Sequence, residues 1–153
     1  MMLSEIIIAN KITTDQFNQI NNLWNQEYPK NLNNRFGKLL DGINTYEHHL
    51  SVNDTNEIIA WAVVFLRDEE FWFSILVHSK HQGKGYGKML INSLKQKHNK
   101  LNGWVIDHNN DLKVNGDPYR SPMQFYLKNG FKVIPEERIE ADIISAVKIC
   151  NFA

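Results

Sequence analysis

Gln82-Gly83-Lys84-Gly85-Tyr86-Gly87 joins an apolar run at residues 72–77 to a segment with helical spacing that begins near Gly85. Its three glycines remove Cβ atoms where a backbone turns tightly and approaches another group closely. A strand that leads into such a loop, with a helix starting inside it, directs backbone N–H groups and the positive end of the helix dipole at one point. The stretch therefore predicts an anion site, and phosphate is the usual anion.

The glycine spacing separates three kinds of phosphate-binding loop. A dinucleotide-binding fingerprint requires G-x-G-x-x-G, whereas Gly83, Gly85 and Gly87 give G-x-G-x-G. A Walker A loop would need Gly where this chain has Gln82, and Ser or Thr where it has Met89, so that pattern is not matched. The third pattern, Q/R-x-x-G-x-G/A, is matched at every defined position. Taken alone, the motif is also compatible with a glycine-rich turn that binds nothing.

Composition indicates one globular domain over residues 1–153. The chain is 42% hydrophobic and 22% charged, and its 17 basic and 17 acidic residues give a net charge of zero. Because proteins that bind DNA or RNA generally carry a basic excess, nucleic acid is not expected as a partner. Cys150 is the only cysteine, so no intrachain disulfide is expected.

The sequence indicates neither a membrane or secreted protein nor a metal-binding protein. No apolar run approaches the roughly 18 residues of a membrane span, and the N-terminal residues lack the features of a signal peptide, so a cytoplasmic protein without a membrane partner is expected. His48-His49 lacks the additional His or Cys that a metal site needs, so no metal is expected.

The N-terminal half predicts a strand, two helices and a meander of three strands. Residues 4–9 are β-branched and apolar, and Thr13 with Gln16 forms a capping box before a helix that ends by Pro29. A second, weaker helix is expected at residues 34–41. Alternation with period two then predicts strands at residues 46–53, 57–67 and 71–77, the last apolar on both faces and therefore central in the sheet.

The C-terminal half continues with a helix at residues 85–98, broken at Asn102-Gly103, and a short strand at residues 104–106 parallel to the strand before the loop. Residues 107–119 form a long polar loop, either functional or a tolerated surface insertion. Ser121 as N-cap, with Pro122 following, begins a short helix that ends at Asn129-Gly130. Strands at residues 131–134, stopped by Pro135, and 143–149 complete the chain.

A second motif, Phe125-Tyr126-Leu127-Lys128-Asn129-Gly130-Phe131, lies on that short helix. With Gln82, Gly85 and Gly87, and with the order of elements, it resembles the GNAT superfamily of acetyl-CoA-dependent N-acetyltransferases. The resemblance covers about residues 71–134, and the N-terminal half agrees in element order alone. It implies an α/β (α+β) fold in one domain: a mixed, mostly antiparallel sheet of about seven strands, about four flanking helices and a splayed parallel strand pair.

The sequence departs from the family pattern at two positions. Tyr119 and Pro122 stand where the family often has Asn and Ala, seven and four positions before the helix Tyr. The connection at residues 107–119 is also longer than usual. The family's Asn contact therefore cannot be carried over, and the acceptor side of the pocket is expected to be reshaped by this loop.

The resemblance also implies a reaction and a set of residues. Acetyl-CoA is the co-substrate, and a primary amine of a small molecule, peptide or protein is the acceptor. Tyr126 matches the general acid, which is reasonable because a phenol with a pKa of about 10 can protonate a thiolate whose pKa is about 8.5. The coenzyme is expected to contact the following residues: Leu76, Val77, Gln82, Gly83, Lys84, Gly85, Tyr86, Gly87, Lys88, Tyr126 and Lys128.

The sequence does not identify the general base or the acceptor. Glu47, His48, His78, Glu70, Asp107 and His108 lie near strand ends and are candidate bases, with Glu70, Asp107 and His108 taken first; a water relay is an alternative. Trp72 or Tyr46 would line the acceptor pocket. A non-catalytic acyl-CoA-binding sensor on the same fold is the alternative function. The protein is expected to be a monomer or a homodimer, with the apolar final strand as a possible dimer edge.

Overall fold

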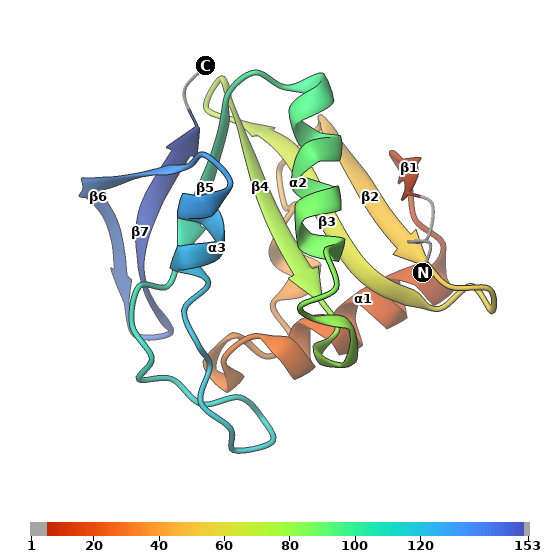
Figure 1. The fold of residues 1–153 in the computed structure, drawn as a ribbon, viewed down its shortest axis with the longest axis horizontal. Coiled ribbons are helices and arrows are strands. Elements are labelled where there is room, and N and C mark those ends of the chain that lie inside the picture. Colours follow the sequence, from red (N-terminus) through yellow and green to blue (C-terminus); the bar gives the residue numbers. More distant parts are fainter. Residues whose placement is uncertain (1–5, 152–153) are drawn as a thin grey trace.

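The computed structural model describes residues 6–151, which form a seven-stranded sheet covered by helices on both faces (Figure 1). The elements in chain order are β1 (Ile6–Ala9), α1 (Thr14–Glu27), η1 (Lys30–Leu32), η2 (Phe36–Lys38), β2 (Tyr46–Val52), β3 (Ile58–Arg67), β4 (Glu70–Val77), η3 (Ser79–His81), α2 (Tyr86–Lys97), β5 (Leu101–Val105), α3 (Met123–Lys128), β6 (Lys132–Ala141) and β7 (Ile144–Asn151), where η denotes a 3-10 helix.

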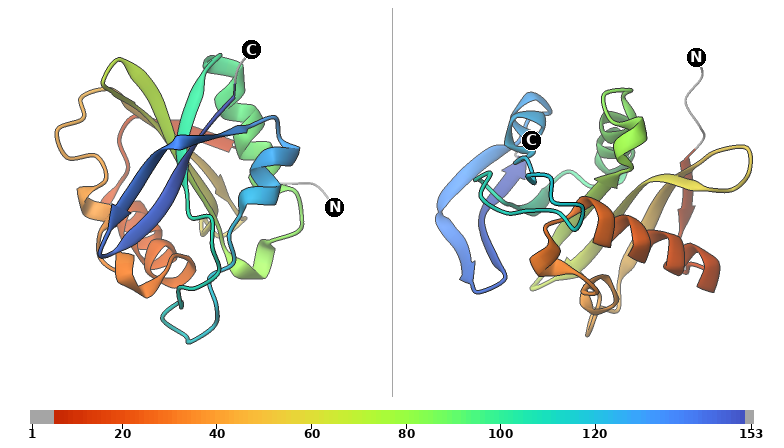
Figure 2. Two further views of the ribbon diagram at one scale, coloured as in Figure 1. Left: turned by 90° about the vertical axis from the view of Figure 1, so that its left-hand side faces the viewer. Right: turned by 90° about the horizontal axis from the view of Figure 1, so that it is seen from below.

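The sheet separates two layers of helices. Helix α1 with η1 and η2 packs on one face, and α2 and α3 pack on the other, as the view from below shows (Figure 2). Ile20, Leu23 and Trp24 of α1 are buried against β2, β3 and β4. Leu90 and Leu94 of α2 are buried against the opposite face of the sheet. Burial of these apolar side chains supplies most of the driving force for the fold.

The strand order β1-β2-β3-β4-β5-β7-β6 places β4 in the middle of the sheet, as its apolar faces predict. All neighbouring strands run antiparallel except β4 and β5. The parallel pair meets at Trp72 and Asn102, and in the described chain no further register position joins the two strands. The predicted seven-stranded mixed sheet with a splayed parallel pair is therefore confirmed.

The first helix begins where its capping box predicts. The Thr13 hydroxyl accepts a hydrogen bond from the Gln16 backbone N–H at 3.0 Å, and the Gln16 side chain accepts one from the Thr13 N–H at 2.9 Å. This exchange satisfies two backbone donors that would otherwise lack a partner. The helix ends at Glu27, before Tyr28 and Pro29. Both residues at this end, Glu27 and Tyr28, therefore lie at a fixed place over the sheet.

The predicted helix at residues 34–41 is wrong. The structure has a single 3-10 turn there, η2, preceded by Asn34 in a left-handed conformation with φ of 63°. Gly37 lies inside the turn and lowers helical propensity, while Phe36 anchors the segment in the core. The described chain thus has three α-helices rather than the four that were expected.

The predicted break at Asn102-Gly103 is also wrong, because both residues lie inside β5. Gly103 fits there because a Cβ would lie 3.0 Å from a ring carbon of Phe73 on the neighbouring strand. The Asn102 side chain donates to the Phe71 carbonyl at 3.1 Å and so ties β5 to β4 at the closed end of the split. Packing between strands has overridden the turn preference of the dipeptide.

The last hairpin differs from its prediction as well. Strand β6 continues through Pro135, with a register shift against β7 between Ile134 and Arg138. Proline is tolerated there because β6 is the edge strand of the sheet. Strand β7 pairs on both sides, with β5 and β6, so the final strand cannot serve as a dimer edge.

Helix α3 is capped at Pro122 rather than Ser121, whose hydroxyl accepts a hydrogen bond from the Met123 N–H at 3.3 Å. Gly130 follows the helix with φ of 89°, as its predicted C-terminal position requires.

Among the described residues, no helix combines the length and the apolar character needed to cross a membrane. The predicted strand at residues 4–9 is confirmed for Ile6–Ala9; Ser4 and Glu5 lie outside the described residues.

Candidate active site

The glycine loop lies where β4 ends and α2 begins, at the open end of the split. Gly83 and Gly85 have φ of 77° and 92°, a left-handed conformation that a side chain would strain. The N–H groups in the first turn of a helix have no intrahelical partner. Gly85, which caps α2, has no side chain that could accept a hydrogen bond from them. Gln82 folds back, and its side-chain amide donates to the Val77 carbonyl at 3.1 Å. The loop therefore has the form of a cradle that would suit an anion.

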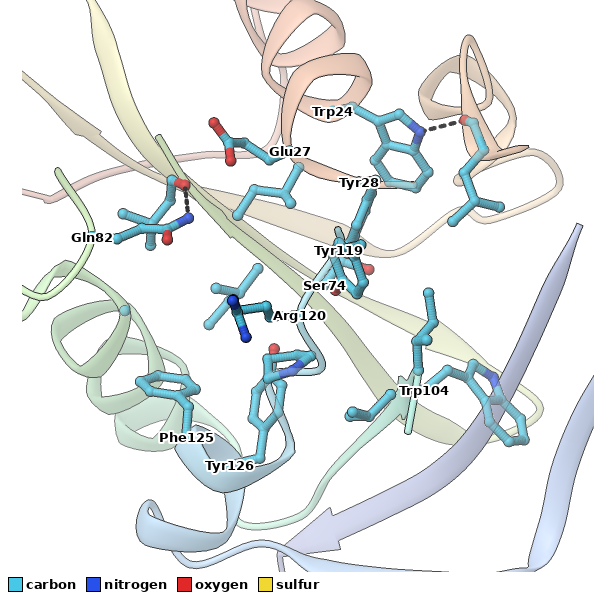
Figure 3. A pocket seen from close by; sticks show the side chains of 18 of the residues that line it. Trp24, Glu27, Tyr28, Ser74, Gln82, Trp104, Tyr119, Arg120, Phe125 and Tyr126 are labelled. Carbon is cyan, nitrogen blue, oxygen red and sulfur yellow. Dashed lines mark hydrogen bonds between the residues drawn. The ribbon is translucent and has the colours of Figure 1, made fainter. Parts of the chain in front are cut away.

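The split between β4 and β5 opens into a cavity of about 910 Å³, shown in Figure 3. The glycine loop lines its mouth through Gln82, Gly83, Gly85, Tyr86, Gly87 and Lys88. Leu76 and Val77 line it from the end of β4, where β5 has diverged and left one edge of the strand without a paired neighbour. Of the predicted coenzyme-binding residues, Lys84 is exposed and lies outside this lining.

Helix α3 closes the cavity on the side of α2. Phe125 packs against the start of α2, where a Cβ on Gly87 would lie 3.0 Å from its ring. Tyr126 is buried among Phe73, Phe125 and Phe131, with ring centroids 5.2 to 5.7 Å apart. Burial raises the pKa of the Tyr126 phenol above its usual value, so the group stays protonated at neutral pH. Tyr126 and Lys128 both line the cavity.

Two further tyrosines lie across the cavity from Tyr126 (Figure 3). Tyr28 caps α1, and its ring centroid lies 6.2 Å from that of Tyr119. Burial raises the pKa of Tyr28 to about 12, and a hydrogen bond with the Ser74 side chain opposes that rise. Burial, with Tyr28 and Tyr126 nearby, also raises the pKa of Tyr119. Tyr119 is the residue that stands where the family often has Asn.

Glu27 is the one carboxylate among the described residues that line the cavity. It is 4% exposed, and its two oxygens have separate partners. Oε2 accepts a hydrogen bond from the Ser79 N–H at 2.9 Å, and Oε1 lies 3.2 Å from the Lys113 ammonium. Sequence reasoning missed Glu27, because one acidic residue at a helix end carries no signal of the cavity that the sheet creates beside it.

The long loop at residues 107–119 is anchored to the end of α1. Besides the Lys113–Glu27 ion pair, the Leu112 carbonyl accepts a hydrogen bond from the Lys30 N–H at 2.8 Å. A single antiparallel bridge between Leu112 and Pro118 closes the loop on itself. These contacts carry Tyr119 and the next residue, Arg120, to the cavity, and Figure 3 shows the Arg120 side chain extending into it.

None of the three base candidates from the sequence lines this cavity. Glu70 lies at the other end of β4, where the Lys100 ammonium is 3.1 Å away and lowers its pKa. Asp107 forms a two-point ion pair with the Arg138 guanidinium at 2.8 and 3.1 Å, which lowers its pKa. His108 accepts a hydrogen bond from the Asn110 N–H at 3.1 Å within its own loop.

The aromatic lining also differs from expectation. Trp104 lines the cavity, whereas Trp72 stacks on Trp104 with ring centroids 5.2 Å apart, and neither Trp72 nor Tyr46 belongs to the lining. No cluster of three or more metal-ligating side chains is found among residues 6–151.

The family model for the acetyltransferase (GNAT) domain matches residues 45–133. No curated protein sequence matches the chain. Solved structures with the same fold include Escherichia coli ElaA, with 13% identity, a TM-score of 0.66 and coverage of 96% of this chain and 99% of that one. A GNAT-family acetyltransferase from Staphylococcus aureus Mu50 has 14% identity, a TM-score of 0.63 and coverage of 96% and 98%.

A phosphinothricin acetyltransferase of the GNAT superfamily from Sinorhizobium meliloti, solved in complex with AcCoA, has 13% identity and a TM-score of 0.62. The match covers 98% of this chain and 88% of that one. These likenesses show the fold, and the family model covers more than half of the chain. The chain therefore belongs to the GNAT acetyltransferase family and is an acyltransferase.

Proposed function

We propose that the protein transfers an acetyl group from acetyl-CoA directly to a primary amine, with residues 1–153 acting as one domain. One observation carries the proposal: a single cavity joins the glycine loop and Tyr126 to the pocket around Tyr28 and Trp104 on the far side of the sheet. A donor and an acceptor that enter from opposite sides of the split would meet beside the free edge of β4. Holding two reactants in this way supplies a large part of a transfer enzyme's rate enhancement.

The donor half of the proposal rests on the cradle. The N–H groups of the glycine loop and of the first turn of α2 would bind the pyrophosphate, with Lys88 and Lys128 beside it. Hydrogen bonds to charged groups contribute roughly 1.5–3 kcal/mol each. The backbone of β4 near Leu76 and Val77, which has no strand partner on that side, would pair with the pantetheine arm and donate to the thioester oxygen.

In the proposed reaction the amine nitrogen forms a bond to the thioester carbon, and the carbon–sulfur bond breaks. Tyr126, whose phenol is protonated at neutral pH, gives its proton to the departing thiolate. The products are the acetylated amine and the free thiol of CoA.

The amine must lose a proton before it attacks, since alkylammonium groups have a pKa of about 10. We propose Glu27 as the proton acceptor, through a water molecule, in preference to Glu70, Asp107 and His108. It is a carboxylate on the cavity lining, and each of its oxygens keeps a lone pair beyond the bonds to Ser79 and Lys113.

Release of the CoA thiol from acetyl-CoA, measured with a panel of primary amines, tests this function. We expect release that saturates with at least one amine and depends on Tyr126. Binding of acetyl-CoA without release by any amine of a broad panel would favour the alternative, a non-catalytic acyl-CoA sensor. The cavity argues against that alternative, because a sensor does not need the additional space that Trp104 and Tyr28 line beyond the glycine loop.

A further inference from the structure

The charges around the cavity are unevenly distributed, although the whole chain has equal numbers of basic and acidic residues. Glu27 is the single carboxylate in the described lining, and Lys113 already neutralises it. The cationic side chains that line the cavity are Arg35, Lys38, Arg67, Lys88, Arg120 and Lys128. The cavity therefore favours ligands that carry negative charge.

These cations form two groups. Lys88 and Lys128 belong to α2 and α3, and Arg120 precedes α3, so all three accompany the glycine loop and would serve the phosphates of the coenzyme. Arg35 and Lys38 belong instead to the η2 segment, and Arg67 ends β3 on the face that α1 covers. The phosphates at the glycine loop do not account for this second group.

Arg67 is held in place by aromatic rings. Its guanidinium carbon lies 5.0 Å from the Phe65 centroid and 6.0 Å from the Trp72 centroid. It forms no ion pair within the described part of the chain. Lys148, whose ammonium lies 5.3 Å from the same Trp72 ring, is by contrast paired with Glu137 at 3.4 Å. Arg67 is thus a half-buried, oriented cation without a carboxylate partner.

An apolar wall adjoins this cation. Trp104 stacks on Trp72, the ring over which Arg67 lies. It packs against one core cluster together with Leu39 and against another together with Ile144. Leu39, Trp104 and Ile144 line the cavity from the end of η2, from β5 and from β7, rather than from the glycine loop. A ligand there would find an apolar surface of moderate size, with Arg67 at one end and Arg35 and Lys38 at the exposed rim.

We propose that the acceptor is a small primary amine that also carries a carboxylate or phosphate group, and that Arg67 binds this anion. The proposal rests on the proposed acetyl transfer and names the class of acceptor. The planar guanidinium can donate two parallel hydrogen bonds to either anion. Polyamines and other polycations are disfavoured, because the described lining offers them no carboxylate without a cationic partner.

Calorimetric titration of the CoA-saturated protein with two pairs of amines tests the proposal. L-phenylalanine is compared with L-phenylalaninamide, and O-phosphoethanolamine with ethanolamine, so each pair differs in the anion. We expect at least one anionic member to bind about tenfold or more tightly than its neutral partner, the effect of one charge-assisted contact. The pair that shows the preference identifies carboxylate or phosphate as the anion.

Variants at Arg67 complete the test. Arg67→Gln should reduce the preference to about threefold or less, and Arg67→Lys should restore part of it. Lys38→Gln, on the exposed η2 turn, keeps the test interpretable if Arg67→Gln unfolds, and it should lower the preference without altering the thermal midpoint.

Equal binding within both pairs, or an undiminished preference in Arg67→Gln and Lys38→Gln, would overturn the proposal. Neither result affects the proposed function, which the CoA-release panel decides separately, because the anion preference is measured by binding and needs no turnover.

Discussion

At the scale of single residues, burial sets the protonation of the side chains that carry the proposed chemistry. Tyr28, Tyr119 and Tyr126 all lie where burial raises the pKa of the phenol, so each is a proton donor at neutral pH. Of the three, Tyr126 lies on the helix that packs against the glycine loop. Its position beside the donor cradle, rather than its chemistry, makes it the proposed acid.

Replacing Tyr126 by Phe removes the proposed acid and keeps the ring. We expect kcat to fall by about 100-fold, the usual contribution of a general acid, while affinity for acetyl-CoA stays nearly unchanged. Steady-state kinetics and calorimetry measure the two quantities. Tyr46→Phe, the same change outside the cavity lining, is the control. An unaltered kcat in Tyr126→Phe would exclude the acid role.

Replacing Glu27 by Gln tests the proposed base. Turnover at neutral pH should fall by about 100-fold and should recover in part as rising pH deprotonates the amine itself. Lys113→Gln is the matched control, because it breaks the same ion pair and keeps the carboxylate. If Lys113→Gln lowers turnover as much as Glu27→Gln does, Glu27 only positions the loop at residues 107–119.

The sequence predicts some of these residues and not others, for a physical reason. Gly85 and Tyr126 belong to local patterns, a loop conformation and a helix signature, that a short stretch determines by itself. Glu27, Tyr28 and Arg67 come together through the pairing of β3 with β4 and the packing of α1, contacts between residues far apart in the chain. A single sequence does not reveal such contacts.

At the scale of elements, the contact between α2 and α3 shapes the proposed donor site. Gly87 allows the Phe125 ring to approach the first turn of α2. A strand, a loop and two helices thus meet within one short region, and the cavity mouth depends on that close approach.

Adding a methyl group at this contact should weaken coenzyme binding. In Gly87→Ala the new Cβ would lie 3.0 Å from the Phe125 ring, so α3 or the ring must shift. We expect the Kd for acetyl-CoA to rise by about tenfold, which corresponds to about 1.4 kcal/mol. Gly37→Ala places its Cβ 3.6 Å from Phe17, an ordinary contact outside the cavity, and should leave the Kd unchanged. Equal Kd values in both variants would contradict the assigned role of this contact.

The contact between β2 and β3 should make stability depend on pH. His48 is buried, and its Nδ1 accepts a hydrogen bond from the Trp61 Nε1–H at 3.0 Å. Burial, with His49 nearby, lowers the pKa of His48 from 6.5 to about 4. Since the unfolded chain takes up this proton near its usual pKa and the folded chain does not, stability is lost as pH falls from about 6.5 toward 4.

Denaturant unfolding at pH 7 and pH 5 measures this effect. We expect the His48 contribution to the free energy of unfolding to decrease by about 2 kcal/mol between the two conditions. His49 and His98, whose pKa values burial also lowers, add to the total, so His48→Gln serves as the reference. An identical pH dependence in His48→Gln would contradict the assignment to His48.

At the scale of the whole molecule, the split between β4 and β5 organises the site. The two strands meet at Trp72 and Asn102 and diverge toward the glycine loop, which leaves a cavity between the two helical layers. The sequence predicts the central strand, the crossover and the splayed pair, because alternation and motif order are strong over this half. It does not predict how β6 and β7 extend, since Pro135 normally indicates the end of a strand and is tolerated here at an edge.

The central claim is that this split binds acetyl-CoA through the loop at residues 82–87. Calorimetric titration of the protein with acetyl-CoA, ATP and NAD tests it most directly. We predict that acetyl-CoA binds with a Kd of roughly 1–100 μM and that ATP and NAD bind at least about tenfold more weakly. Binding of ATP or NAD as tightly as acetyl-CoA, or no binding of acetyl-CoA, would contradict the account.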